Sequence, residues 1–117
     1  MEFVIYHNPR CSKSRATLQL LEDNGIKPKV VLYLETPPDH QQLDSILRGL
    51  EMEPLDLVRK GEDKYTELGL GNNQALGRDQ LIEIMIANPN LIERPIVVGG
   101  DQVVIGRPPE NVLTLLT

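Results

Sequence analysis

The first 34 residues carry the pattern that most restricts the fold of this chain: an apolar strand, an amphipathic helix and a second apolar strand. The sequence predicts strands at Phe3–Tyr6 and Lys29–Leu34, and a helix from about Ser12 to Asn24. Asn8-Pro9 ends the first strand and Asn24-Gly25 ends the helix, because such dipeptides interrupt regular structure. Two strands joined by a helix over so short a stretch form a βαβ unit, and its strands run parallel in one sheet.

The predicted helix has an apolar side and a charged side. We expect Ala16, Leu18 and Leu21 to face the core, while Glu22 and Asp23 stay in water. One face of this helix should therefore pack against the interior of the domain.

The only cysteine, Cys11, stands at the junction between the first strand and the helix. A thiol at that point meets unpaired backbone N–H groups and the positive end of the helix dipole. Arg10, Lys13 and Arg15 add positive charge nearby. These influences favour the thiolate, the nucleophilic form of cysteine, although a lone cysteine is often only a small buried apolar residue. We predict that Cys11 is a catalytic nucleophile.

Composition excludes several other functions. The formal charge of −5 argues against a general binder of nucleic acid or of anionic membranes. No apolar run approaches the ~18 residues that suggest a membrane helix, and we expect a cytoplasmic protein. One cysteine excludes an internal disulfide, and no cysteine–histidine cluster supplies metal ligands. We also expect a monomer with no bound cofactor.

The middle of the chain lacks strand signals. We expect a first helix capped by Asp39. Further helices should cover about Pro54–Arg59, Asp63–Leu68 and Arg78–Ala87. Together they form a helical insert at about residues 39–90. Gly99-Gly100-Asp101 then joins two short apolar strands, Ile96–Val98 and Gln102–Ile105, in a hairpin. A helix follows from about Pro109 to Leu116. The predicted class is α/β, with a mixed four-stranded sheet flanked by helices.

The order β-α-β, insert, β-β-α is the thioredoxin arrangement. A cysteine follows the first strand, and Arg94-Pro95 precedes the third strand at Ile96. Such a fold keeps a cis proline beside the helix of the active site, where its backbone can face a ligand. We therefore expect Pro95 to be cis.

Four separated blocks of the sequence carry a family resemblance. They are His7 to Arg15, with the spacing His-x3-Cys-x3-Arg; Val58-Arg59-Lys60 with Tyr65 and Leu68-Gly69-Leu70; Glu93 to Val98; and Gly106-Arg107-Pro108. In this order, over essentially the whole chain, they resemble the glutaredoxin-coupled arsenate reductases of bacteria. The resemblance implies a single thioredoxin-like domain over residues 1–117 and an enzyme that reduces arsenate to arsenite.

The resemblance also implies a site and a mechanism. The arginines that bind substrate in the family correspond to Arg59, Arg94 and Arg107. Guanidinium groups suit an oxyanion, because each offers paired N–H donors at constant charge. Cys11 would attack arsenic, and glutathione as co-substrate and then glutaredoxin as partner would complete the reduction. Independently of the resemblance, a reductase with a single cysteine needs an external thiol.

Three supporting residues are predicted from their positions near the thiol. Ser14, three residues after Cys11 in the first helical turn, is expected to hydrogen-bond the thiolate. His7 either holds the cysteine loop or tunes the thiolate. Arg15 either adds positive field or makes a structural ion pair.

Two other functions stay open. Redox-responsive regulators with the same fold bind RNA polymerase, but they typically carry a Cys-x-x-Cys pair where this chain has Cys11 and Ser14. The other is a thiol-transfer module without arsenate activity. The chain has Ser12-Lys13 where the best-known reductases carry small residues, and the added positive charge suits an anion.

Overall fold

The computed structural model describes residues 2–72 and 75–116. It contains two compact units: Met1–Pro37 together with Arg94–Thr117, here called the sheet unit, and Pro38–Glu93, here called the helical unit. A single domain over residues 1–117 stays a prediction.

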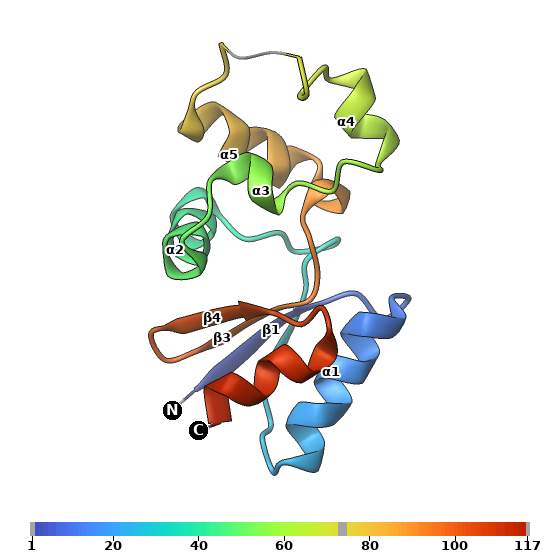
Figure 1. Cartoon of the computed structure of the whole chain (residues 1–117), viewed down its shortest axis with the longest axis vertical. Helices are drawn as coiled ribbons and strands as arrows, with labels where there is room; N and C mark the ends of the chain where they lie inside the picture. Colours follow the sequence, from blue (N-terminus) through green and yellow to red (C-terminus); the bar gives the residue numbers. More distant parts are fainter. Residues whose placement is uncertain (1, 73–74, 117) are drawn as a thin grey trace. The chain divides into compact units, whose positions relative to one another are not determined.

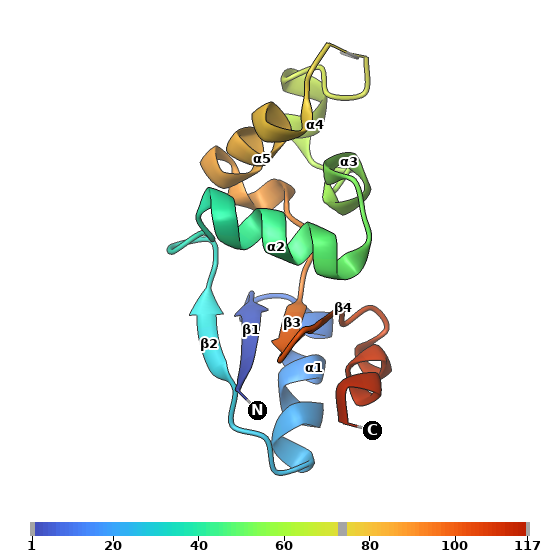
Figure 2. The ribbon, with the colours of Figure 1, turned by 90° about the vertical axis from the view of Figure 1, so that its left-hand side faces the viewer.

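The sheet unit contains a mixed sheet of four strands (Figure 2). The strands are β1 (Phe3–His7), β2 (Lys29–Leu32), β3 (Ile96–Gly99) and β4 (Gln102–Ile105), in the spatial order β2-β1-β3-β4. In the register of β1, Tyr6 lies opposite Val31 of the parallel strand β2 and opposite Ile96 of the antiparallel strand β3. The predicted βαβ unit and hairpin are therefore confirmed.

Two helical segments cover one face of this sheet (Figures 1 and 2). They are the α-helix α1 (Ser12–Asp23) and the 3-10 helix η2 (Pro109–Leu116), which pack side by side. The core between them and the sheet comprises Phe3, Ile5, Leu21, Val97, Val112 and Leu115. Aliphatic side chains thus supply most of the buried surface that holds this unit together.

The inward face of α1 differs from the predicted one. Ser14, Thr17 and Leu21 are fully buried, Leu18 is only partly buried, and Ala16 is exposed. Positions 14, 17 and 21 follow the three- and four-residue spacing of a single helix face, so burial of this set turns Ala16 towards water. The prediction for Ala16 was wrong because it ranked side chains by apolarity, whereas two polar residues occupy the buried face.

Strand β2 is shorter than predicted. It ends at Leu32, whose carbonyl accepts hydrogen bonds from the N–H groups of Glu35 (2.9 Å) and Thr36 (2.8 Å). These bonds close a turn, so Tyr33 and Leu34 leave the sheet. Tyr33 is nevertheless almost completely buried.

The helical unit occupies the middle of the chain (Figure 1). Its elements are α2 (His40–Leu50), α3 (Pro54–Leu57), α4 (Asp63–Glu67), α5 (Arg78–Ala87) and the 3-10 helix η1 (Pro89–Leu91). The predicted cap at Asp39 is confirmed, because its side chain accepts from the N–H of Gln42 while the Gln42 side chain accepts from the N–H of Asp39. Helix α3 stops before the predicted end at Arg59, since Val58 forms an extended bridge with Ile92.

Two peptide bonds before proline are cis among the described residues. The Arg94–Pro95 bond is cis, as the sequence predicts, and so is the Arg107–Pro108 bond, which the sequence analysis missed. No helix within residues 2–72 and 75–116 combines the length and apolar character needed to cross a membrane.

Candidate active site

Cys11 is the N-cap residue of α1 and is partly exposed. Its backbone is extended, with φ −94° and ψ 123°. Its N–H donates to the carbonyl of Asn8 (3.0 Å), and its own carbonyl accepts from the N–H of Arg15 (3.0 Å). These bonds close the turn after β1 and start the helix, so the predicted place of the thiol at a helix N-terminus is confirmed.

The loop before Cys11 is braced by the buried hydroxyl of Ser14. Ser14 Oγ lies 2.6 Å from His7 Nδ1 and accepts from the N–H of Asn8 (3.0 Å). Both Ser14 and His7 are buried, with exposed fractions of 0% and 6%. For His7, these contacts favour the first of its two predicted roles, holding the cysteine loop. A hydrogen bond from Ser14 to the thiolate stays a prediction.

Burial and the nearby charge of Arg15 lower the pKa of His7 below its ordinary value of 6.5. The imidazole is therefore neutral at pH 7, and its hydrogen bond with Ser14 joins two uncharged groups. Arg15 also reaches back over the loop, where its Nη1 donates to the carbonyl of Pro9 (3.1 Å). Both roles predicted for Arg15, a positive field at the thiol and a structural ion pair, stay predictions.

One predicted substrate-binding arginine lies beside the thiol. The Nη1 atom of Arg107 is 3.8 Å from Cys11 Sγ and 3.5 Å from the carbonyl oxygen of Arg94. The two partners come from positions 96 residues apart, since Arg107 follows β4 and Cys11 precedes α1. A guanidinium at this distance stabilises negative charge on sulfur and on an anion that approaches it.

The other two predicted arginines have different surroundings. Arg94 belongs to the sheet unit and enters the cis bond to Pro95. Arg59 belongs to the helical unit, where its guanidinium lies 3.3 Å from Glu62 and 3.7 Å from Glu93. The gathering of all three arginines around Cys11 stays a prediction.

A family model described as the ArsC family matches residues 6–115. The chain belongs to the ArsC family. An arsenate reductase of Neisseria meningitidis is 46% identical over 116 residues, which cover 98% of both chains. An uncharacterized protein of Escherichia coli K12, YfgD, is 53% identical over 113 residues, or 96% of this chain and 94% of the relative.

A solved structure of an arsenate reductase from Vibrio cholerae has the same fold as this ArsC family chain. The two share 50% sequence identity and a TM-score of 0.93, with 98% of each chain covered. The predicted thioredoxin-like α/β class is therefore confirmed.

Sequence reasoning missed two residues that adjoin the site of this ArsC family chain. Thr17 Oγ1 lies 2.8 Å from the carbonyl oxygen of Lys13 and 3.2 Å from that of Gly106, the residue before Arg107. Gly106 entered the sequence analysis only as part of the Gly106-Arg107-Pro108 block of the family resemblance, which gave it no role of its own. Thr17 had one detectable signal, since it shares a helix face with Leu21 and is therefore a polar residue on the buried side.

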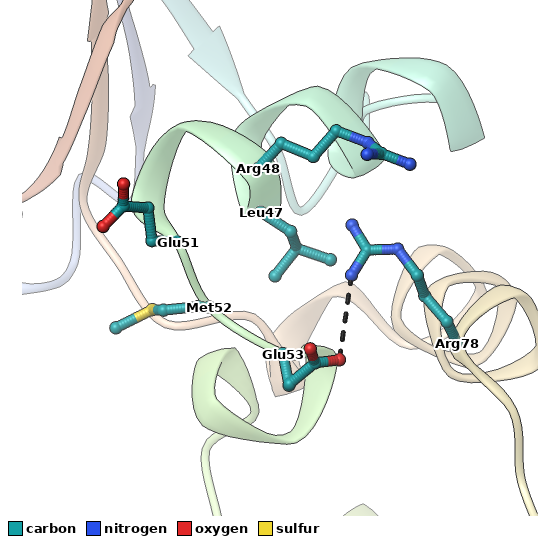
Figure 3. A pocket seen from close by; sticks show the side chains of 6 residues that line it. All are labelled: Leu47, Arg48, Glu51, Met52, Glu53 and Arg78. Atoms are coloured by element: carbon teal, nitrogen blue, oxygen red, sulfur yellow. Dashed lines mark ion pairs between the residues drawn. The ribbon is translucent and has the colours of Figure 1, made fainter.

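Each unit has a surface pocket in the part of the chain that the structure describes. The smaller, of about 220 Å³, borders the cysteine loop and is lined by His7, Asn8, Pro9, Arg10, Leu32, Leu34 and Glu35. The larger, of about 420 Å³, belongs to the helical unit and contains none of the predicted site residues (Figure 3). There Arg48 and Arg78 point towards one another, and both bind Asp44, at 2.8 and 2.9 Å.

The larger pocket differs from the cysteine site in the pairing of its arginines with carboxylates. Arg78 also lies 3.9 Å from Glu53, so carboxylates already neutralise the guanidinium groups there. Within residues 2–72 and 75–116, no group of three or more His, Cys, Asp or Glu side chains is placed to hold a metal ion. Cys11 with Arg107 is therefore the candidate active site.

Proposed function

We propose that this protein is an enzyme that reduces arsenate to arsenite, with Cys11 as the nucleophile. The observation that carries the proposal is the 3.8 Å approach of the Arg107 guanidinium to the sulfur of the only cysteine. Membership of the ArsC family and the named arsenate reductases at 46% and 50% identity support arsenate as the substrate.

The first step is an attack of the thiolate on arsenic. A sulfur–arsenic bond forms, and one arsenate oxygen leaves as water after taking up protons. Thiolate and oxyanion repel one another, so the step needs positive charge at the point of contact. Arg107 supplies a fixed charge there, and Arg94 of the same unit and Arg59 are proposed to bind the remaining oxygens.

Reduction from As(V) to As(III) needs two electrons, which this chain cannot supply through an internal disulfide because it has one cysteine. We propose that glutathione, as co-substrate, adds to the arsenic of the adduct with loss of a second water. A glutaredoxin thiolate then attacks the glutathione sulfur and forms a glutaredoxin–glutathione disulfide. The arsenic–sulfur bond to glutathione breaks, and its electron pair stays on arsenic, which becomes As(III). Hydrolysis releases arsenite and restores the Cys11 thiol. The cytoplasm, which keeps thiols reduced, suits this chemistry.

A coupled assay tests the proposal. Purified protein is mixed with arsenate, glutathione, glutaredoxin, glutathione reductase and NADPH, and arsenate-dependent NADPH oxidation is followed. The wild type should be active and Cys11→Ser inactive, because an alcohol does not replace the thiolate as a nucleophile here. Ser12→Ala, which changes the exposed neighbour, is the matched control.

Two outcomes of this assay would contradict the proposal. Full activity of Cys11→Ser would exclude the mechanism. A folded wild type that alkylates at Cys11 but never consumes NADPH with arsenate would point instead to a thiol-transfer module or a regulator.

A further inference from the structure

Two buried hydroxyl groups lie on the same face of α1 and bind different segments of the chain. Ser14 and Thr17 are both fully buried and three residues apart. Ser14 binds the loop that carries Cys11, through His7 and Asn8. Thr17 binds the segment that carries Arg107, through Gly106. One helical turn therefore connects the two segments that supply the thiol and the guanidinium.

The Thr17 hydroxyl acts directly on the peptide unit before Arg107. It has one proton, which it shares between the carbonyl of Lys13 at 2.8 Å and the carbonyl of Gly106 at 3.2 Å. The first bond stays within the helix and fixes the direction of the side chain. The second joins α1 to the C=O that immediately precedes the Arg107 nitrogen.

Gly106 packs against Thr17 without a side chain between them. A Cβ atom at Gly106 would overlap Thr17 Oγ1 and would lie 2.8 Å from Pro95 Cγ, closer than Cβ atoms approach other atoms in proteins. The Gly106 N–H also donates to the carbonyl of Pro95 (2.9 Å). Its backbone is therefore held between α1 and the cis proline.

The side chain of Asn111 holds the backbone on the C-terminal side of Arg107. Asn111 Nδ2 donates to the Arg107 carbonyl (3.1 Å) and to the Ile105 carbonyl (3.2 Å). Hydrogen bonds thus hold the peptide units on both sides of Arg107, and its side chain extends to Cys11 Sγ.

We propose that Thr17 is a positioning residue, whose hydroxyl sets the place of the Arg107 guanidinium beside Cys11. The Thr17 hydroxyl hydrogen-bonds the carbonyls of Lys13 and Gly106, so its effect on the site passes through the Gly106–Arg107 peptide. The inference rests on the proposed role of Arg107 in the arsenate site, but its consequence for the charge near sulfur needs no arsenate.

The test compares two alkylating reagents that differ in charge. Iodoacetate is an anion and iodoacetamide is neutral, so the ratio of their rate constants reports the positive charge near Cys11 Sγ. Cys11 is the only cysteine, so both reagents modify a single thiol. Arg107→Gln calibrates the assay. It should lower the iodoacetate-to-iodoacetamide ratio by about fivefold, the order expected for a unit charge at about 4 Å in water.

Thr17→Val removes the hydroxyl and keeps the shape of the side chain. We expect it to lower the ratio by about two- to fivefold, towards the Arg107→Gln value, and Thr17→Ser to restore the wild-type ratio. In the Arg107→Gln background, Thr17→Val should have no further effect on the ratio. A merely structural threonine would change thermal stability and leave the charge ratio at the wild-type value.

Either of two results would overturn the proposal. One is a folded Thr17→Val protein with the wild-type iodoacetate-to-iodoacetamide ratio. The other is that Thr17→Val lowers the ratio as much in the Arg107→Gln background as it does in the wild type. Should Thr17→Val fail to fold, Thr17→Ala is compared with Thr17→Ser by the same criteria. Because no arsenate is present, failure of the reductase assay leaves this measurement intact. In an active enzyme, Thr17→Val should also raise KM for arsenate more than it lowers kcat.

Discussion

The buried polar side chains mark the site at the scale of single residues. Among the described residues, the buried polar side chains are His7, Ser14 and Thr17, and all three act on the segments that carry Cys11 and Arg107. Buried hydroxyl and imidazole groups are tolerated where they are hydrogen-bonded. Their burial here is explained by the positions that they hold rather than by apolar packing.

Ser14→Ala should destabilise the protein by about 1–3 kcal/mol, because it leaves the imidazole of His7 and the N–H of Asn8 without their hydroxyl partner. Urea unfolding followed by circular dichroism measures the change. Ser12→Ala, at an exposed position of the same helix, should stay within about 0.5 kcal/mol of the wild type. Equal effects of the two variants would contradict the bracing role of Ser14.

The lowered pKa of His7 gives the stability a pH dependence of defined sign. Below its ordinary pKa of 6.5, the unfolded chain binds a proton that the folded protein resists. The stabilising contribution of neutral His7 is therefore complete above about pH 6.5 and is lost as the pH falls through that value. Urea unfolding of wild type and His7→Gln at about pH 7.5 and about pH 5.5 measures it, and the variant should lose less stability on acidification.

His40 serves as a control because its pKa is shifted in the opposite direction to that of His7. Hydrogen bonds to the carboxylates of Glu83 and Asp79, which accept from the imidazole ring, raise the pKa of His40. Its contribution is therefore complete below pH 6.5 and is lost as the pH rises through the folded pKa. His40→Gln should change the pH slope in the direction opposite to His7→Gln. A common direction for both variants would refute the assignment.

At the scale of elements, the sequence predictions were correct where local residues define a helix or strand. They were wrong for the buried face of α1 and for the end of β2. Strand β4 and helix α5 have the predicted bounds, because hairpin residues and helical spacing define them locally. The inward face of α1 and the end of β2 were not predictable in the same way. The first depends on hydrogen-bond partners that are distant in sequence, and the second on bonds to the Leu32 carbonyl.

The C-cap residue of α2, Glu51, has an unfavourable backbone conformation. Its φ is 57° and its ψ is 42°, a left-handed conformation that suits glycine. Glu51→Gly should therefore stabilise the protein by up to about 1 kcal/mol. Thermal or urea unfolding measures the change. Glu51→Ala is the control, because alanine keeps the Cβ atom that disfavours a left-handed backbone. A less stable glycine variant would contradict the expectation.

At the scale of the whole molecule, the site is built from distant parts of the sequence. The sequence alone predicted the βαβ unit, the hairpin and the setting of Cys11, since each is a local pattern. Three isolated arginines have no local pattern, and only the family resemblance pointed to them. The 3.8 Å contact of Arg107 with Cys11 depends on the β3–β4 hairpin, on Thr17 and on Asn111 together.

Arg107→Lys tests the importance of a planar guanidinium in this assembly. One point charge replaces a donor pair, so KM for arsenate should rise by about tenfold or kcat should fall to a similar extent. Steady-state kinetics in the coupled assay measure both constants. Arg48→Lys, in the pocket of the helical unit, should leave them unchanged. Wild-type kinetics for Arg107→Lys would show that no arsenate oxygen binds there.

The sheet unit draws its strands from both ends of the sequence, and this has a consequence during synthesis on the ribosome. Strands β1 and β2 emerge early, but β3 and β4 follow only after residue 94. While residues 12–106 are being synthesised, the nascent chain therefore carries Cys11 without the arginine that lies beside it in the folded protein. The thiol can acquire this partner only after Arg107 has been synthesised and the β3–β4 hairpin has joined the sheet.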